Sequence, residues 1–173
     1  MEALILTLQI TLPAALVMYA MYLIIKTFLQ KEFEKRAVEI QLKNKELILP
    51  TRLQAYERIC LLLERIAPAN MIPRVNQPDF TAGFLHARLL AEIRDELNHN
   101  LSQQVYMSDK AWTLTKHAVQ EINTIINHTA QSVNGEEKSI VLVKAIFDFL
   151  VNKEEDPIAS ALTFVKNEIR SLY

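Results

Sequence analysis

The sequence predicts an all-α protein, in which an N-terminal transmembrane helix continues into a stalk and then into a cytoplasmic bundle of about five helices. Three observations lead to this prediction. Residues 3–25 contain no charged side chain. After them, apolar residues recur at spacings of three and four over long stretches, which is the period of an amphipathic helix. The 173 residues include only 2 glycines, which disfavours β-folds rich in hairpins.

The composition also excludes several kinds of functional site. A phosphate-binding loop or a dinucleotide fingerprint needs glycines within about six residues of one another, but Gly83 and Gly135 lie far apart in the sequence. Cys60 is the only cysteine, so the chain has neither a disulfide framework nor the spacing of a zinc site. We expect its thiol to be buried and unreactive, since its neighbours in sequence are apolar.

The charge of the chain argues against a nucleic-acid partner. The formal net charge is −1. Because Glu2 is the only charged residue before Lys26, the rest of the chain balances 19 basic residues with 19 acidic ones. A protein that binds nucleic acid usually carries a basic surplus on its folded part. No nucleic-acid partner is therefore predicted.

Residues 1–29 are predicted to form a transmembrane anchor whose partner is the lipid bilayer. The uncharged run over residues 3–25 is long enough, at about 1.5 Å per residue, to cross a hydrocarbon core of about 30 Å. Membrane helices tolerate a proline such as Pro13. A cleaved signal peptide would have a basic start and a shorter apolar core, whereas this chain starts with Met-Glu.

The distribution of basic residues predicts the orientation of this anchor. No lysine or arginine precedes the apolar run, whereas six follow it closely: Lys26, Lys31, Lys35, Arg36, Lys43 and Lys45. Basic residues favour the cytoplasmic side. We therefore expect a single-pass protein of the inner membrane with its N-terminus outside and its C-terminal domain in the cytoplasm.

Residues 30–49 are predicted to form a helical stalk that could pair as a coiled coil. Its candidate interaction residues follow one stripe at spacings of four and three: Phe33, Ala37, Ile40, Asn44 and Leu47. A single buried asparagine such as Asn44 often fixes the register of a coiled coil. The run spans only about two heptads, so an amphipathic stalk that lies on its own domain fits equally well. In the first case a second copy of the chain could pair through the stalk.

The remaining residues, 50–173, are predicted to form the bundle. Pro50 suits the first turn of a helix over residues 50–68. The stretch that follows carries Pro68, Pro73 and Pro78 and is expected to be a loop. A second helix is expected over residues 79–97, where Arg88 and Glu92 have the spacing of a surface ion pair.

The second half of the bundle shows clear helix boundaries. Ser108 is expected to begin a helix that ends at Gly135, a residue suited to the left-handed conformation after a helix. Residues 139–151 are apolar nearly all round, so they are expected to form the central, most buried helix. The last helix is expected to begin at Asp156 with Pro157 in its first turn.

The stretch "NHNLSQQVYMSD", residues 98–109, is the second candidate interaction surface. Its uncharged donors and acceptors are Asn98, His99, Asn100, Gln103 and Gln104. They could recognise a partner, but amide-rich joints more often satisfy the backbone groups of neighbouring helix ends. The spacing of Leu101, Val105 and Met107 suggests a short extended segment with these side chains inward. We favour a structural joint over a docking surface.

Two strings carry a resemblance to a known family. They are "LPTRLQAYERICLLLERIAPANMIPR", residues 49–74, and "HNLSQQVYMSDKAW", residues 99–112. With the anchor before them, they resemble an uncharacterised family of Bacteroidota proteins that have one N-terminal membrane helix and a cytoplasmic helical domain. The resemblance implies this location and architecture. It implies no activity and no catalytic residue.

No residue is predicted to be catalytic or to hold a cofactor or metal. The four histidines are His86, His99, His117 and His128. No two of them have the spacing of a metal site on one helix. The expected function is a non-enzymatic, membrane-anchored scaffold or interaction module for other membrane or cytoplasmic proteins, as a subunit of a larger inner-membrane assembly. The alternative is a small-molecule sensor or enzyme with a pocket in the bundle near His99, Tyr106 and Trp112.

Overall fold

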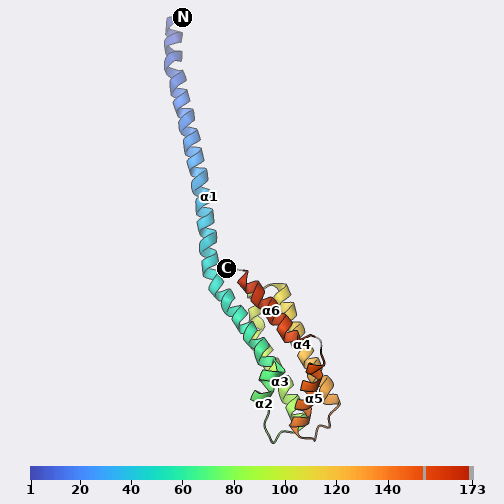
Figure 1. Ribbon diagram of the computed structural model, residues 1–173. Coiled ribbons are helices and arrows are strands. Elements are labelled where there is room, and N and C mark those ends of the chain that lie inside the picture. The colour runs from blue at the N-terminus through green and yellow to red at the C-terminus, as the bar shows by residue number, and fades with distance from the viewer. Residues whose placement is uncertain (154, 172–173) are drawn as a thin grey trace. The chain divides into compact units, whose positions relative to one another are not determined.

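The computed structural model describes residues 1–153 and 155–171, except for the side chains of residues 3–6, 8, 10, 44 and 45. These residues form six α-helices and one 3₁₀-helix (Figure 1). The prediction of an all-α protein is confirmed. The chain divides into two compact units, residues 1–48 and residues 49–173.

Helix α1, Glu2–Ile66, is the longest element of the chain. By length and composition it can cross a membrane near its N-terminal end. Pro50 does not begin a new helix as predicted, because α1 continues through it. Proline fixes φ at a helical value and removes one backbone hydrogen bond. In the second unit, α1 buries Tyr56, Ile59 and Leu63, so the packing of the following turns offsets that loss.

The other helices of the second unit follow in short steps: α2, Pro68–Val75; α3, Ala82–Asn100; the 3₁₀-helix η1, Leu101–Tyr106; α4, Asp109–Gln131; α5, Ser139–Val151; and α6, Pro157–Arg170. Helix α2 replaces the predicted loop. Pro68 fits its first turn, and its apolar residues Met71, Ile72 and Val75 are buried in the core. The three prolines of this segment, which predicted a loop, are therefore compatible with a short helix.

Hydrogen bonds at the caps confirm the helix starts predicted at Ser108 and Asp156, whereas the helix predicted over residues 79–97 begins at Ala82, after a cap at Thr81. Thr81 Oγ1 accepts a bond from Phe84 N at 3.2 Å. Ser108 Oγ accepts a bond from Ala111 N at 3.1 Å. Asp156 Oδ1 accepts bonds from the first backbone N–H groups of α6. Each cap supplies an acceptor to an N–H group that has no partner within its own helix.

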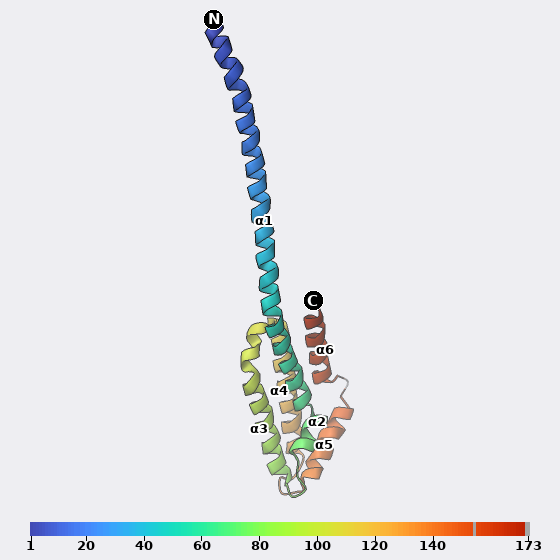
Figure 2. The same ribbon diagram turned by 90° about the vertical axis from the view of Figure 1, so that its left-hand side faces the viewer.

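The central helix of the bundle is α4, whereas the sequence predicted α5. Helix α4 packs against α3, α5 and α6 (Figure 2). Helix α5 buries only Ser139, Leu142 and Ile146, while its opposite face leaves Ile140 and Val151 exposed. Apolar residues all round a helix are typical of burial, but here part of that apolar surface faces outward.

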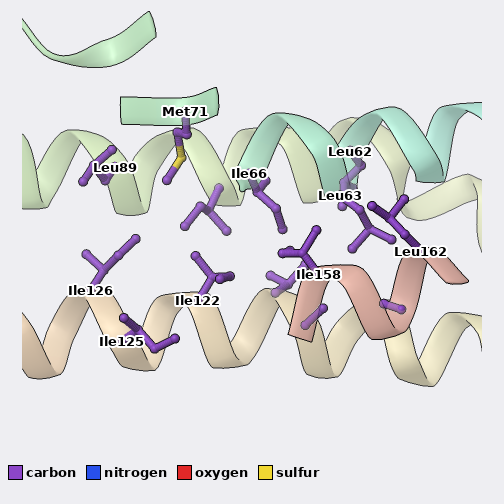
Figure 3. Close-up of a cluster of buried hydrophobic side chains, with 14 of the residues drawn as sticks. Leu62, Leu63, Ile66, Met71, Leu89, Ile122, Ile125, Ile126, Ile158 and Leu162 are labelled. Carbon is purple, nitrogen blue, oxygen red and sulfur yellow. The ribbon is translucent and has the colours of Figure 1, made fainter. Parts of the chain in front are cut away.

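The core lies between the C-terminal part of α1 and helices α2, α3, α4 and α6. Side chains from these elements point toward one another in Figure 3. They include Leu62, Leu63 and Ile66 of α1, Met71 of α2, Leu89 of α3, Ile122, Ile125 and Ile126 of α4, and Ile158 and Leu162 of α6. Because α1 and α3 both contribute to this core, the surfaces that they form together, described below, are held in place by it.

The two glycines of the chain contact each other. Gly83 N donates to Gly135 O at 2.9 Å, and a Cβ on Gly83 would lie 3.3 Å from the same oxygen. Gly135 was expected to be left-handed at the end of a helix, but no described glycine has a positive φ, and α4 already ends at Gln131. The close approach of two backbones, rather than an unusual φ, explains these glycines.

Candidate interaction surfaces

The stalk stripe exposes its large apolar side chains. Phe33, Ile40 and Leu47 of α1 are 69%, 60% and 75% exposed, and Ala37 is exposed as well. The side chain of Asn44 lies outside the described residues. Singly exposed apolar residues are ordinary, but a contiguous exposed stripe is typical of a surface that meets a partner.

The stretch 98–109 is mostly helical, and only Met107 and Ser108 within it have extended backbone. Asn98, His99 and Asn100 end α3, and Gln103 and Gln104 belong to η1. The expectation that Leu101, Val105 and Met107 all point inward is wrong, because only Met107 is buried. In a 3₁₀-helix side chains repeat every three residues, so the alternation of an extended strand does not apply here.

Part of this stretch acts as a structural joint. Asn100 is buried, and its Nδ2 donates to Glu96 O at 2.8 Å. Arg52 Nε of α1 donates to Tyr106 O at 3.0 Å, at the end of η1. These bonds satisfy carbonyl groups near the ends of α3 and η1, although the second is made by a side chain outside the stretch.

The polar end of this stretch, at Ser108, is held by a partly buried hydrogen-bond cluster that the sequence did not indicate. Glu168 of α6 accepts bonds from Tyr56 Oη at 2.5 Å and from Ser108 Oγ at 2.8 Å. Burial, followed by the neighbouring Glu168 carboxylate, raises the pKa of Tyr56 above its ordinary value. The phenol therefore stays protonated and donates. No local pattern could indicate this cluster, since its members lie on three separate helices.

The other part of the stretch is free to meet a partner. Asn98, His99 and Gln104 are exposed, and within the described residues they make no side-chain hydrogen bond or ion pair. Among the same residues, the Gln103 side chain bonds only to the neighbouring Ser102, at 3.2 Å. The residues of this stretch that make structural hydrogen bonds and those that stay exposed without such bonds are therefore different residues.

His99 and Asn100 also line a groove between the C-terminal ends of α1 and α3. The groove has a volume of about 700 Å³, and its lining is Gln54, Glu57, Arg58, Leu61, Leu62, Arg65, Glu96, His99 and Asn100. The alternative function predicts a ligand pocket near His99, Tyr106 and Trp112, but this groove contains only His99 of the three. Trp112 is buried in the core, and Tyr106 lies on η1. We refer to this feature below as the α1–α3 groove.

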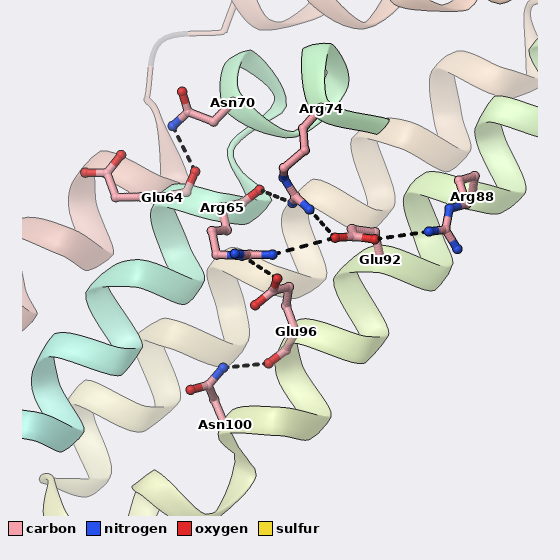
Figure 4. Close-up of polar contacts among 8 residues, drawn as sticks. All are labelled: Glu64, Arg65, Asn70, Arg74, Arg88, Glu92, Glu96 and Asn100. Atoms are coloured by element: carbon pink, nitrogen blue, oxygen red, sulfur yellow. Dashed lines mark hydrogen bonds and ion pairs between the residues drawn. The ribbon is translucent and has the colours of Figure 1, made fainter. Parts of the chain in front are cut away.

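One wall of the α1–α3 groove is fixed by a network of ion pairs (Figure 4). The Glu92 carboxylate forms ion pairs with Arg74 of α2, with Arg88 at 3.7 Å and with Arg65 at 4.0 Å. Arg65 also pairs with Glu96. The hydrogen bond from Arg74 is the main cause that lowers the pKa of Glu92, against a smaller opposing effect of burial. The expected Arg88–Glu92 pair is confirmed.

The same network covers two carboxylates and leaves one arginine free. The side chains of Glu92 and Glu96 are only 14% and 13% exposed and are bound by arginines. Arg58, which lines the groove, makes no ion pair with any described residue. It is therefore available to a group that enters from outside.

A family model described as "Family of unknown function (DUF7935)" matches residues 2–172. The chain belongs to the DUF7935 family. This agrees with the resemblance to an uncharacterised family. No curated protein and no solved structure matches the chain.

This DUF7935 protein has a second groove that sequence reasoning did not indicate. It lies between α4 and α5, has a volume of about 520 Å³ and is lined by His128, Thr129, Ser132, Ala145, Asp148, Phe149, Asn152 and Lys153. The rings of His128 and Phe149 lie 5.3 Å apart. These two rings form an aromatic wall of the groove, on a different side of α5 from the exposed Ile140 and Val151.

Groups with reactive chemistry in the DUF7935 chain are sparse. Across the described residues, no three His, Cys, Asp or Glu side chains are placed to hold a metal ion. Cys60 is only partly buried. Desolvation is the main cause that raises its pKa, and Lys166 opposes it. The thiol is therefore held in its protonated, less nucleophilic form.

Proposed function

We propose that this protein is a single-pass scaffold of the bacterial inner membrane, of the Bacteroidota type, without enzymatic activity. Its N-terminus lies outside, and residues 49–173 form a cytoplasmic interaction module within a larger membrane assembly. The alternative of a sensor or enzyme would need a ligand pocket that contains His99. The open, mixed polar and apolar α1–α3 groove fits a protein partner better than a small molecule, which usually binds in an enclosed apolar site.

One observation carries the proposal. Every residue from 11 to 30 has an exposed side chain, including Met18, Tyr19 and Ile24. In water, so much apolar surface on one helix would be unfavourable by about 25 cal/mol per Å². Lipid removes this cost. The basic residues that follow favour the cytoplasmic side for the rest of the chain.

Tethering is the mechanism of such a protein. A module confined to a membrane meets other membrane components at a raised effective concentration. Weak contacts through a groove or an exposed stripe then suffice for assembly. We assign two residues that line the α1–α3 groove to contacts with a partner: the unpaired Arg58 and the exposed His99.

The anchor is tested with the full chain. The double substitution Ala15→Arg/Met18→Arg places two charges in the apolar run, at a cost of about 2.5–3.5 kcal/mol each near the bilayer centre. We expect it to move the protein from the carbonate-resistant membrane pellet to the supernatant. The control Ala15→Leu/Met18→Leu should stay in the pellet. Native protein found in the cytosolic supernatant would end the proposal.

The scaffold role is tested by the partners that co-purify. After mild crosslinking in cells and purification in gentle detergent, Arg58→Ala/His99→Ala should lose at least about 1.4 kcal/mol of affinity, or tenfold in recovery, for its main partner. The matched control is Lys116→Ala/His117→Ala, which changes the same kinds of side chain on the exposed face of α4. Equal recovery with both variants would exclude the groove as the partner site.

A further inference from the structure

We infer that the stalk is a parallel homodimerisation surface, so that one partner of this protein is a second copy of itself. The inference rests on the proposed membrane anchoring, which places identical stalks side by side. The surface, which we call the stalk seam, runs from Leu29 to Ile48 on helix α1. It includes the stripe predicted from the sequence and extends it at both ends.

The stalk seam is a continuous apolar arc. Leu29 and Ile48 are 47% and 54% exposed and share the helix face of Phe33, Ile40 and Leu47. At 3.6 residues per turn, these positions fall within an arc of about 100°. Every charged residue between positions 30 and 48 falls outside that arc. A helix face of this width and composition is the kind that a partner helix covers.

The charges beside the seam favour parallel copies. The stripe from position 33 to position 47 alternates steps of four and three, as the inward positions of a heptad do. Beside this stripe, the flanking positions on one side are Arg36 and Lys43, and those on the other side are Glu34, Gln41 and Ile48, the last of which also extends the seam. In an antiparallel pair the two basic flanks would face each other. In a parallel pair Arg36 and Lys43 face Gln41 and Ile48 of the second copy.

The same register shows where the pairing ends. Continued along α1, the inward positions become Thr51, Gln54, Arg58, Leu61 and Arg65. Across a two-fold axis each arginine would meet the same arginine of the second copy, which is unfavourable. The pairing therefore stops near Ile48. This leaves Arg58 and the α1–α3 groove available to a different partner.

The short seam also explains why association depends on the membrane. A heptad pattern indicates an independent coiled coil convincingly only when it continues over about three to four heptads. The pattern in this stalk is shorter. Anchoring in a bilayer supplies the parallel alignment and a raised effective concentration. We expect the dimer in membranes and a shift towards monomer when detergent dilutes the protein.

Disulfide crosslinking in native membranes tests the inference. Full-length protein with Cys60→Ser receives single cysteines at seam positions, by Phe33→Cys, Ile40→Cys or Leu47→Cys. Control cysteines stand at exposed positions off the seam, by Lys35→Cys, Glu39→Cys or Leu42→Cys. Oxidation should give at least about fivefold more dimer at all three seam positions than at the controls. Crosslinking at position 40 alone would indicate antiparallel pairing and overturn the inference.

A pair of matched lysine variants adds a second readout. Ile40→Lys/Leu47→Lys charges the seam and should abolish the dimer formed through Ala37→Cys. Val38→Lys/Leu42→Lys charges two side chains of the same helix that are 55% and 56% exposed but lie off the seam, and it should leave that dimer unchanged. Loss of the dimer in both variants would mean that charge alone, rather than the seam, controls association.

The outcomes separate the inference from the proposed function. Protein that stays in the membrane pellet but crosslinks equally everywhere, or nowhere, would overturn the stalk dimer and leave the membrane scaffold intact. Protein that is absent from the pellet would overturn both. Crosslinking confined to the seam in membrane-bound protein would support both.

Discussion

Ile126→Ala is expected to lower the free energy of unfolding of the bundle by about 2–5 kcal/mol. Ile126 is 0% exposed and lies on α4, the helix that packs against three others. The truncation removes buried methyl groups and leaves a cavity that close-packed neighbours fill only partly. Denaturant unfolding of the detergent-solubilised protein measures the loss through the fluorescence of Trp112, the only tryptophan.

The same substitution in α5 is the control. Ile140 is 50% exposed, so Ile140→Ala should cost less than about 0.5 kcal/mol. The two variants remove identical atoms and differ only in burial. A loss at Ile140 equal to that at Ile126 would show that the apolar face of α5 is covered in the protein, and that the central position belongs to α5 after all.

Glu92→Gln is expected to destabilise the bundle by about 1–3 kcal/mol. The substitution removes the negative charge that three arginines share, while it keeps the size of the side chain. Because those arginines are themselves 37–52% exposed, water screens part of the loss. The control is Glu57→Gln in the same groove, whose carboxylate is exposed and makes no ion pair within the described residues. It should change stability by less than about 0.5 kcal/mol.

The same carboxylate makes stability depend on pH. The pKa of Glu92 is lowered in the folded protein from an ordinary value of 4.5. A lowered folded pKa means that the unfolded chain binds the proton first. The contribution of Glu92 is therefore complete above about pH 4.5 and is lost as the pH falls through the folded pKa. Unfolding at a series of pH values should show a smaller acid loss for Glu92→Gln than for the native protein.

The parts of the fold that depend on nearby residues could be predicted from the sequence. The caps at Ser108 and Asp156 follow from side chains that bond within three residues of themselves. The burial of α5 could not be predicted, because an apolar helix is covered only where other helices pack against it. The short helix α2 was missed for a related reason: its prolines suit a first turn as well as a loop, and Met71 and Ile72 become decisive only when the core surrounds them.

In the candidate site, too, some residues could be predicted from the sequence and others could not. His99 and Asn100 could be singled out because an uncharged polar stretch between helices is visible in the sequence. Of the partners of Glu92, only Arg88 could be predicted, because it lies one helical turn away. Arg65 and Tyr56 could not be predicted as partners of Glu92 and Glu168, since they approach from distant parts of the chain. Helical spacing says which face a charge occupies, but tertiary packing decides whether that face meets water or another helix.

The contact between Gly83 and Gly135 determines where this chain tolerates insertions. Besides that contact, Ala82 N donates to Glu137 O at 2.7 Å and Ser139 N donates to Phe80 O at 2.9 Å. The segment after α4 is thus bound to the start of α3 in a fixed register, although it lies on the surface. One inserted residue would shift that register and place a Cβ between two backbones. A fluorescent label attached to a single cysteine therefore belongs on an open helix face, for example by Ser160→Cys on α6, rather than in this loop.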